Sequence, residues 1–132
     1  MQYFKELEVL LDASSAPYSG FNVASIVVTE AEEIFKGVNV ESVAYPTTIC
    51  AERNAIFSAI TQGVKSGEIR EVHILARNAE KVFVAAFPCG SCRQVIAEQS
   101  LNRAKVYVYS SETEVSEHTI EALLPQAFFS LT

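Results

Sequence analysis

Three cysteines and one glutamate have the types and spacing that metal-assisted chemistry requires. Cys89 and Cys92 are three positions apart, and Cys50 lies far upstream, two residues before Glu52. Residues three apart share one face of a helical turn, so the sulfurs of Cys89 and Cys92 can converge on one ion. Cys50 can supply a third sulfur if the two segments meet. Three thiolates are a soft donor set that suits Zn²⁺.

Three protein ligands leave one position of a tetrahedral zinc ion open, which is typical of catalytic rather than structural zinc. Glu52 need not bind the metal, because two positions after Cys50 its side chain points away from the direction of the sulfur, yet it can lie near the open position. A carboxylate there can take a proton from an attacking water and return it to a substrate nitrogen. These four residues therefore predict a hydrolytic zinc site with Glu52 as its acid–base group.

Other interpretations of the same residues remain open at this point. Cys89-Gly90-Ser91-Cys92, between a predicted strand and a helix, is also the arrangement of a thioredoxin-like redox pair. His73 or His118 would close the tetrahedron into a structural site, although neither has ligand-like spacing to a cysteine. The cysteines would otherwise be ordinary buried thiols. Glu52 alone would complement the dipole at a helix N-terminus.

Arg53 favours the metal site over these alternatives. The helix dipole disfavours a cation in the first turn, so a cation there indicates a local anionic partner. Three thiolates on one Zn²⁺ leave an excess negative charge, which Arg53 can offset, so that a bound water keeps a low pKa. The remaining alternative for Arg53 is a simple surface residue.

The elements around these residues alternate between strands and helices. Apolar positions at helical spacing predict a helix over residues 2–12 and another from Cys50 to about Val64, while a third opens at Pro88 and runs to about Gln99. We expect Thr48 or a neighbour to cap the second helix. Strands are predicted at Val23–Thr29, Ile34–Val40, Glu71–Arg77, Lys81–Phe87 and Lys105–Tyr109, and a short last helix at His118–Leu124. The first two strands are expected to form a hairpin, and the third and fourth are either separate strands or one bent strand. The alternation predicts one layered α/β domain over residues 1–132, with helices on both faces of one sheet.

Length and composition bound the class of protein. Of 132 residues, 49% are hydrophobic and 20% charged, as in a globular domain. No apolar run approaches the ~20 residues of a membrane helix, and the first residues lack the order of a signal peptide. A net charge of −6 repels phosphate polymers, so neither nucleic acid nor an anionic membrane is an expected partner. An odd number of cysteines without a sign of export indicates the reducing cytoplasm.

Two stretches together carry a resemblance to a known family. Cys50-Ala51-Glu52-Arg53 and Pro88-Cys89-Gly90-Ser91-Cys92-Arg93-Gln94 closely resemble the zinc signature of cytidine deaminases, and more narrowly the short, homotetrameric type with three cysteine ligands. The resemblance covers nearly the whole chain, with further matches at Ala16-Pro17-Tyr18-Ser19, Phe21, Val23, Gly37-Val38-Asn39-Val40-Glu41, Tyr45, Glu121-Ala122-Leu123-Leu124-Pro125 and Phe128.

This resemblance implies a three-layer α/β/α fold with a mixed sheet of about five strands, a Zn²⁺ cofactor, and deamination of cytidine, with 2′-deoxycytidine as a second substrate, in pyrimidine salvage. Zinc-activated water would attack C4 of the pyrimidine while Glu52 moves protons to N3 and to the departing ammonia. Asn39 and Glu41 resemble residues that hydrogen-bond the sugar hydroxyls. The resemblance implies three further contacts with the substrate. The ring of Phe21 would form a wall of the pocket, and the backbone of Ala51 would contact the base. Phe128 corresponds to a residue that, in the family, stacks on the pyrimidine of a neighbouring subunit.

The sequence departs from the family pattern at three places. Ala24-Ser25-Ile26 is bulkier than the usual small residues, Ser42-Val43 replaces Asn-Ala, and Phe87 replaces a small polar residue before Pro88. None of these is a zinc ligand or Glu52, so the reaction type is a firmer expectation than the range of substrates.

Two other classes of deaminase are alternatives. An enzyme acting on a modified cytosine nucleoside, such as blasticidin S, shares the cysteine signature but not the set of Phe21, Glu41 and Phe128. Polynucleotide deaminases usually have a histidine as the first ligand and a basic surface, so Cys50 and the net charge of −6 disfavour them.

Overall fold

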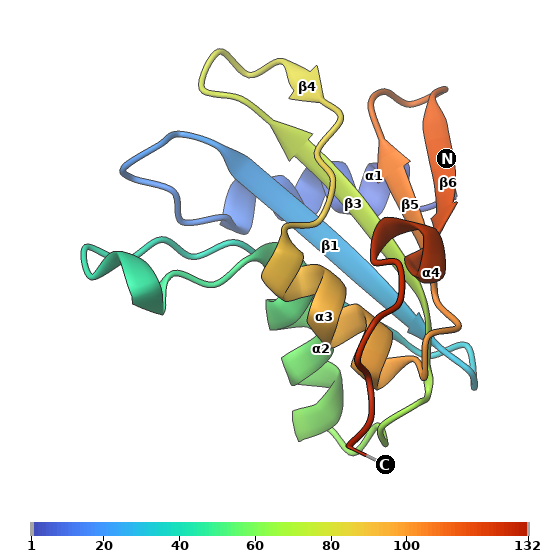
Figure 1. The fold of residues 1–132 in the computed structure, drawn as a ribbon. Helices are drawn as coiled ribbons and strands as arrows, with labels where there is room; N and C mark the ends of the chain where they lie inside the picture. The colour runs from blue at the N-terminus through green and yellow to red at the C-terminus, as the bar shows by residue number, and fades with distance from the viewer. Residues whose placement is uncertain (1, 132) are drawn as a thin grey trace.

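The computed structural model describes residues 2–131, which form a mixed sheet of six strands with helices (Figure 1). The strand order is β2-β1-β3-β5-β6, and β4 pairs with the last two residues of β3. Only the β3–β5 pairing is parallel. The strands are β1 (Asn22–Thr29), β2 (Ile34–Val38), β3 (Ile69–Arg77), β4 (Phe83–Val84), β5 (Lys105–Tyr109) and β6 (Val115–Thr119).

Strands β1 and β3 form the centre of the sheet because their sequences are apolar on both faces. The last six residues of β1 are all buried, and β3 contains five consecutive buried residues. The predicted hairpin of β1 and β2 is present although its turn lacks Gly and Asn. Thr29 supplies the missing turn contact, because its Oγ1 accepts a hydrogen bond of 3.1 Å from the Glu33 backbone, while Glu32 adopts a φ of 66°.

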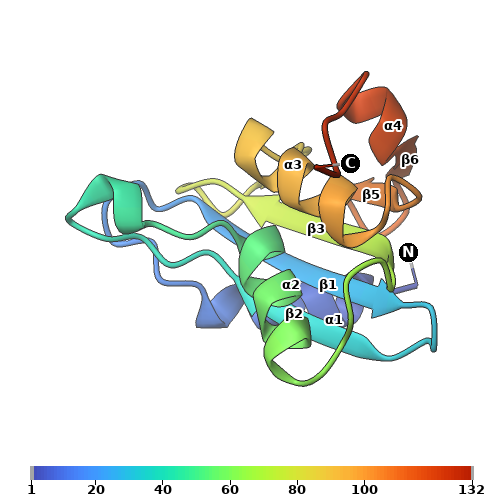
Figure 2. The same cartoon turned by 60° about the horizontal axis from the view of Figure 1, so that its bottom comes forward.

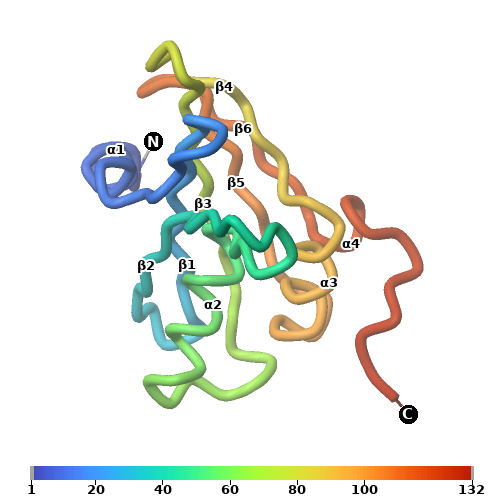
Figure 3. The backbone as a smooth tube through the Cα atoms, turned by 90° about the vertical axis from the view of Figure 1, so that its left-hand side faces the viewer, coloured from blue at the N-terminus to red at the C-terminus, as the bar shows by residue number. Residues whose placement is uncertain are grey.

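Helices cover both faces of the sheet, as predicted. Helix α1 (Phe4–Leu10) lies on one face, while α2 (Ala51–Thr61) and α3 (Gly90–Gln99) lie on the other (Figures 2 and 3). The short α4 (Ile120–Leu123) follows β6. Short 3-10 helices occupy Leu11–Ala13 and Tyr45–Thr47. The three-layer α/β/α fold is thereby confirmed.

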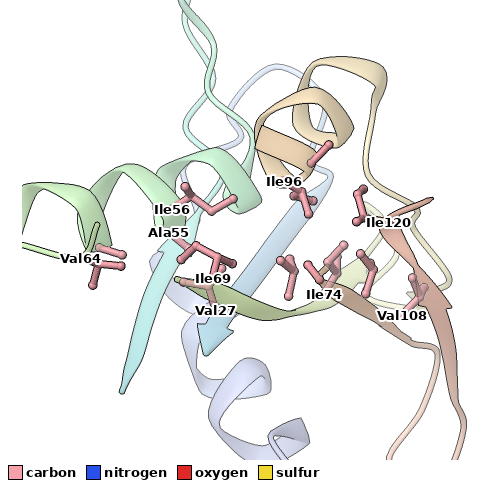
Figure 4. Packing of buried hydrophobic residues seen from close by; sticks show 14 residues of the cluster. Val27, Ala55, Ile56, Val64, Ile69, Ile74, Ile96, Val108 and Ile120 are labelled. Atoms are coloured by element: carbon pink, nitrogen blue, oxygen red, sulfur yellow. The ribbon is translucent and has the colours of Figure 1, made fainter. Parts of the chain in front are cut away.

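Each face of the sheet has its own hydrophobic core. On the α2 and α3 face, Val27, Ile74 and Val108 from three neighbouring strands pack against Ile56 and Ile96 from the two helices (Figure 4). On the α1 face, the buried residues are Phe4, Leu7, Leu11, Ala24, Ile26, Val28, Leu75 and Tyr109. The first of these cores holds α2 and α3 on the same face of the sheet, so their N-terminal ends can meet.

Two local predictions were wrong. The segment that includes His118 is strand β6 and not the start of the last helix, because its backbone pairs with β5 from Thr119 to Val115. The predicted strand at Lys81–Phe87 pairs only over Phe83–Val84. The mixed sheet of six strands agrees with the expected sheet of about five, and β6 is the strand that was not individually predicted.

Thr48 does not cap α2, contrary to the prediction. Its Oγ1 accepts a hydrogen bond of 3.0 Å from the Ser42 backbone, within the loop that projects from the body of the fold (Figure 1). The N-cap residue of α2 is Cys50, whose side chain makes no capping hydrogen bond.

Candidate metal centre and substrate cavity

The three cysteines meet at the N-terminal ends of two helices. Cys50 is the N-cap residue of α2, Cys89 is the N-cap residue of α3, and Cys92 lies in the first turn of α3. Their Sγ atoms all lie within 4.8 Å of one another, and those of Cys50 and Cys89 are 3.8 Å apart. Neither N-cap sulfur bonds the helix backbone, so both are free to bind an ion. Unpaired backbone N–H groups at the two helix ends favour negative charge on these sulfurs.

Close packing of α2 on strand β2 sets the position of Cys50. A Cβ atom on Gly37 would lie 2.3 Å from the Ala55 backbone nitrogen and 2.6 Å from the Ala51 carbonyl oxygen, so only glycine permits this approach. The Asn54 side chain then donates a hydrogen bond of 3.0 Å to the Val38 carbonyl. These contacts place the first turn of α2 against the sheet edge.

The sulfur cluster fits a zinc ion. Tetrahedral Zn–S bonds of about 2.3 Å place the sulfurs roughly 3.8 Å apart, close to the separation of Cys50 and Cys89. All three cysteines are free, and within the described chain the cluster contains no histidine. His73 instead contacts Glu71 and Tyr109 on the opposite face of the sheet. A third sulfur beside the Cys89–Cys92 pair favours a metal site over a redox pair, and three ligands leave one position for an exchangeable group.

Arg53 lies beside the cluster, where its Nη2 donates a hydrogen bond of 3.4 Å to the Cys50 Sγ. The hydrogen bond from Cys92, together with Arg53, lowers the pKa of the Cys50 thiol to about 5. The bond to Cys50 also raises the pKa of Arg53. Conversely, the hydrogen bond with Cys50 and burial raise the pKa of Cys92. The guanidinium therefore offsets negative charge on the sulfurs, as its position in the first turn led us to expect.

Glu52 is a buried carboxylic acid, with 5% of its surface exposed. Burial raises its pKa to about 7, and the neighbouring Cys50 thiolate adds to this rise, while its own backbone N–H acts in the opposite direction. The side chain is held on the first turn of α2 and lines a cavity beside the sulfurs. A group of this kind can accept or donate a proton near neutral pH.

The cavity beside the cluster has a volume of about 230 Å³, which suits a small-molecule ligand. It brings together most of the residues for which we predicted a substrate role. Its lining consists of Phe21, Val23, Asn39, Glu41, Thr48, Ile49, Cys50, Ala51, Glu52, Ile74, Ala86, Phe87 and Cys89. The buried Cys92 does not line it.

Asn39 and Glu41 line the cavity, and both side chains already make several hydrogen bonds to other groups of the protein. The Asn39 Oδ1 accepts a hydrogen bond of 2.9 Å from the Val23 backbone, and its Nδ2 donates one of 2.8 Å to the Phe21 carbonyl. The Glu41 carboxylate accepts hydrogen bonds from the backbones of Tyr18 and Ser19 and from the Ser19 hydroxyl. That hydroxyl is the main reason why the pKa of Glu41 is lowered. Asn39 retains one free N–H, and Glu41 is an ionised acceptor at the cavity wall.

Phe87 is a cavity residue to which the sequence analysis assigned no role. Its ring lines the cavity and contacts the ring of His118 edge-on, with centroids 5.0 Å apart. Its position two residues before Cys89 was the available signal, since a residue so close to an expected metal ligand must lie near the sulfur cluster. The contact with His118 was not foreseeable, because strand β6 was not predicted.

Phe128 lies outside this cavity, on the C-terminal segment that follows α4, and 66% of its surface is exposed. The structure thus separates it from the site of its own chain.

Among residues 2–131, no helix is long and apolar enough to cross a membrane.

Comparison with known proteins agrees with this geometry. Residues 1–109 match the family model described as the cytidine and deoxycytidylate deaminase zinc-binding region. A cytidine deaminase of Sporosarcina psychrophila is 39% identical over 112 residues, covering 85% of this chain and 78% of the relative. That of Mycoplasma genitalium is 31% identical and covers 94% of this chain and 91% of the relative. The crystal structure of a cytidine deaminase from Burkholderia pseudomallei superposes with a TM-score of 0.86 at 31% identity, covering 96% and 97% of the two chains.

The chain belongs to the cytidine and deoxycytidylate deaminase zinc-binding family. The resemblance seen in the two cysteine segments is therefore confirmed, and so is the α/β fold that it implied. The protein is a zinc-dependent hydrolytic enzyme, and the three clustered sulfurs are the groups that fit the ion.

Proposed function

We propose that this enzyme hydrolyses cytidine, and also 2′-deoxycytidine, to the corresponding uracil nucleoside and ammonia. One observation carries the proposal: the buried Glu52 carboxyl group lines the same small cavity as the sulfurs of Cys50 and Cys89. An acid–base group, a metal centre and a space for a nucleoside base thus share one enclosure. The cytidine deaminase activity named for its relatives is the reaction that such an enclosure suits.

In this proposal, the protein groups around the cavity bind and orient the nucleoside. The ring of Phe21 and the backbone of Ala51 contact the base, while Glu41 and the free N–H of Asn39 hydrogen-bond the sugar hydroxyls. The hydrogen bond from Asn39 to the Phe21 carbonyl links the sugar contacts to the aromatic wall. Apolar side chains in the lining lower the local dielectric, which strengthens the polar contacts inside.

In this proposal, the Glu52 carboxyl group carries out both proton transfers. Zn²⁺ held by Cys50, Cys89 and Cys92 supplies a Lewis acid that lowers the pKa of water. As water adds to C4 of the pyrimidine, the Glu52 carboxylate accepts its proton and delivers it to N3. Glu52 then takes the remaining proton from the hydroxyl group on C4 and gives it to the exocyclic amine, so that the C4–O bond becomes a carbonyl, the C4–N4 bond breaks, and ammonia leaves. Water and cytidine are consumed, and uridine and ammonia are formed, with Glu52 returned to its initial state.

We also propose a homotetramer in which each site is completed by a neighbouring chain. Phe128 is exposed and lies outside the cavity of its own chain, and apolar side chains of α2, Phe57 and Ile60, are 44% and 39% exposed. Exposed apolar surface of this kind is typical of subunit contacts. In the assembly, Phe128 stacks on the pyrimidine in the neighbour's cavity.

Three free thiols suit the reducing cytoplasm, where we place the enzyme in pyrimidine salvage.

The proposed activity is tested by ammonia release from a panel of substrates. Zinc-loaded protein is assayed with cytidine, 2′-deoxycytidine, cytidine monophosphate, free cytosine and a modified cytosine nucleoside, with metal content measured alongside. We expect turnover of the first two nucleosides, with kcat lower by about 10²- to 10⁴-fold or more in Glu52→Gln protein. Zinc-loaded protein that binds cytidine without releasing ammonia, or that prefers the modified nucleoside, would contradict the proposal.

A further inference from the structure

The C-terminal segment is bound to the helix that carries two of the metal ligands. Arg93, directly after Cys92, donates from Nε to the Pro88 carbonyl and from Nη1 to the Leu123 carbonyl, both at 2.7 Å. One guanidinium therefore joins the loop before Cys89 to the end of α4. Leu123 is the last residue of α4, and the C-terminal segment begins directly after it. The hydrogen bond from Arg93 to Leu123 therefore fixes where this segment starts relative to the sulfur cluster.

Gln94 binds the same segment further along. Its Nε2 donates a hydrogen bond of 2.6 Å to the backbone carbonyl of Phe128. Because this bond is made to the backbone, it holds the chain at Phe128 while leaving the ring free. Both points of attachment come from consecutive residues in the first half of α3.

The neighbours of Phe128 determine which way its ring points. Ala127 and Phe129 are partly buried and pack against the hydrophobic core of the α2 and α3 face, whereas Phe128 between them is 66% exposed. Successive side chains of an extended chain point to opposite sides. The packing of Ala127 and Phe129 against the core, together with the hydrogen bond from Gln94, thus directs the ring of Phe128 away from its own chain.

We propose that Gln94 is a positioning residue for the substrate site of a neighbouring subunit. It touches neither the cavity nor the metal ligands, and it acts by holding Phe128 at the angle that its stacking partner requires. This inference rests on the proposed role of Phe128 in the assembly. Loss of the bond from Gln94 weakens nucleoside binding and leaves the proton transfers of Glu52 unchanged, so KM rises while kcat is retained.

The test compares three single variants of the full-length zinc enzyme. Gln94→Met and Gln94→Glu remove the donor with nearly the same side-chain size. We expect each to raise KM for cytidine by about 2- to 10-fold, the fold-change equivalent to one net hydrogen bond. The kcat and the zinc content are expected to stay at the wild-type level. The control is Gln99→Met at the end of the same helix, whose side chain has no hydrogen bond among the described residues and whose KM we expect to be unchanged.

A double-mutant cycle separates the two proposals. If Gln94 acts through Phe128, Gln94→Met adds no further rise in KM in a Phe128→Ala background. A Phe128→Ala protein with normal KM would overturn the role of Phe128 itself. A raised KM in Phe128→Ala but not in the Gln94 variants would overturn only the positioning role. Loss of zinc or of kcat in the Gln94 variants would also overturn it, since Gln94 would then support the metal centre.

Discussion

Cys50 and Cys89 occupy the same structural position on two different helices, each as the N-cap residue, and their sulfurs lie 3.8 Å apart. An N-cap residue usually bonds the helix backbone through its side chain. Here neither sulfur does so, and both point to a shared centre. The two cysteines that we propose as metal ligands thus stand where ordinary caps would, and the two helix ends supply a favourable field for thiolates. This symmetry explains how segments far apart in the sequence build one centre.

Glu52→Gln should separate binding from catalysis. The amide keeps the shape of the side chain but cannot accept and return a proton, so we expect kcat to fall by about 10²- to 10⁴-fold or more. Zinc content and nucleoside affinity should be nearly unchanged. Ammonia release, metal analysis and calorimetric titration with cytidine provide the three measurements. Near-normal turnover would remove Glu52 from the mechanism.

Cys89→Ala should remove the metal and much of the stability. Two sulfurs bind zinc far more weakly than three, and metal binding contributes to folding. We expect zinc content well below one ion per chain and a lower midpoint of thermal unfolding. Ser91→Ala, an exposed position in the same turn, is the matched control and should keep its zinc. Retention of the ion by Cys89→Ala would contradict the ligand assignment.

Mixing two impaired variants, Phe128→Ala and Glu52→Gln, should restore activity at low cytidine if sites are shared. Phe128→Ala is expected to weaken nucleoside binding by about 1–3 kcal/mol, the range for stacking on a base. A chain with Glu52→Gln still presents its own Phe128. Mixed assemblies refolded from the two variants should therefore contain sites with Glu52 from one chain and Phe128 from another. Kinetic assay at low cytidine measures this recovery, and mixtures no more active than the separate variants would argue against sharing.

Gly37→Ala should disturb the site through the packing of α2 on β2. The added Cβ would lie 2.3 Å from the Ala55 nitrogen, so backbone must move. Overpacking of this kind costs about 1–3 kcal/mol in the free energy of unfolding. We also expect lower kcat/KM, because the same turn carries Glu52. Urea unfolding tests the stability, with Gly90→Ala as the control, since a Cβ there meets no atom within 4 Å. Equal stability of the two variants would contradict the packing argument.

His73 should make the stability depend on pH. Burial lowers its pKa below the ordinary value of 6.5, although Glu71 opposes this shift. The unfolded chain therefore binds a proton more readily than the folded one. As pH falls below about 6.5, the free energy of unfolding should decrease by at most about 1.4 kcal/mol per unit from this group. Urea unfolding between pH 7.5 and 5 on a roughly half-unit grid measures the slope. In His73→Gln protein the slope should be shallower, and an identical slope would exclude His73 as its source.

Local sequence was sufficient for the elements with strong periodicity and for the chemistry of the site. The strand Lys105–Tyr109 and the two helices that begin near Cys50 and Cys89 follow from alternation, helical spacing and turn residues. The edge strand β6 does not, because its residues lack an apolar alternation and it is stabilised by backbone pairing with β5. An edge strand of this kind is recognisable only once its partner is in place.

The sequence of the two segments Cys50–Arg53 and Pro88–Gln94 predicted a zinc-dependent hydrolytic centre and, through its resemblance, the family to which the chain belongs. The tertiary structure decided how that centre is enclosed. It placed Phe87 in the cavity wall and directed Phe128 away from it. The physical reason is that donor chemistry is a property of each side chain and its close neighbours. Enclosure and orientation arise instead from contacts between distant segments, which exist only when the sheet and its two helical layers are packed.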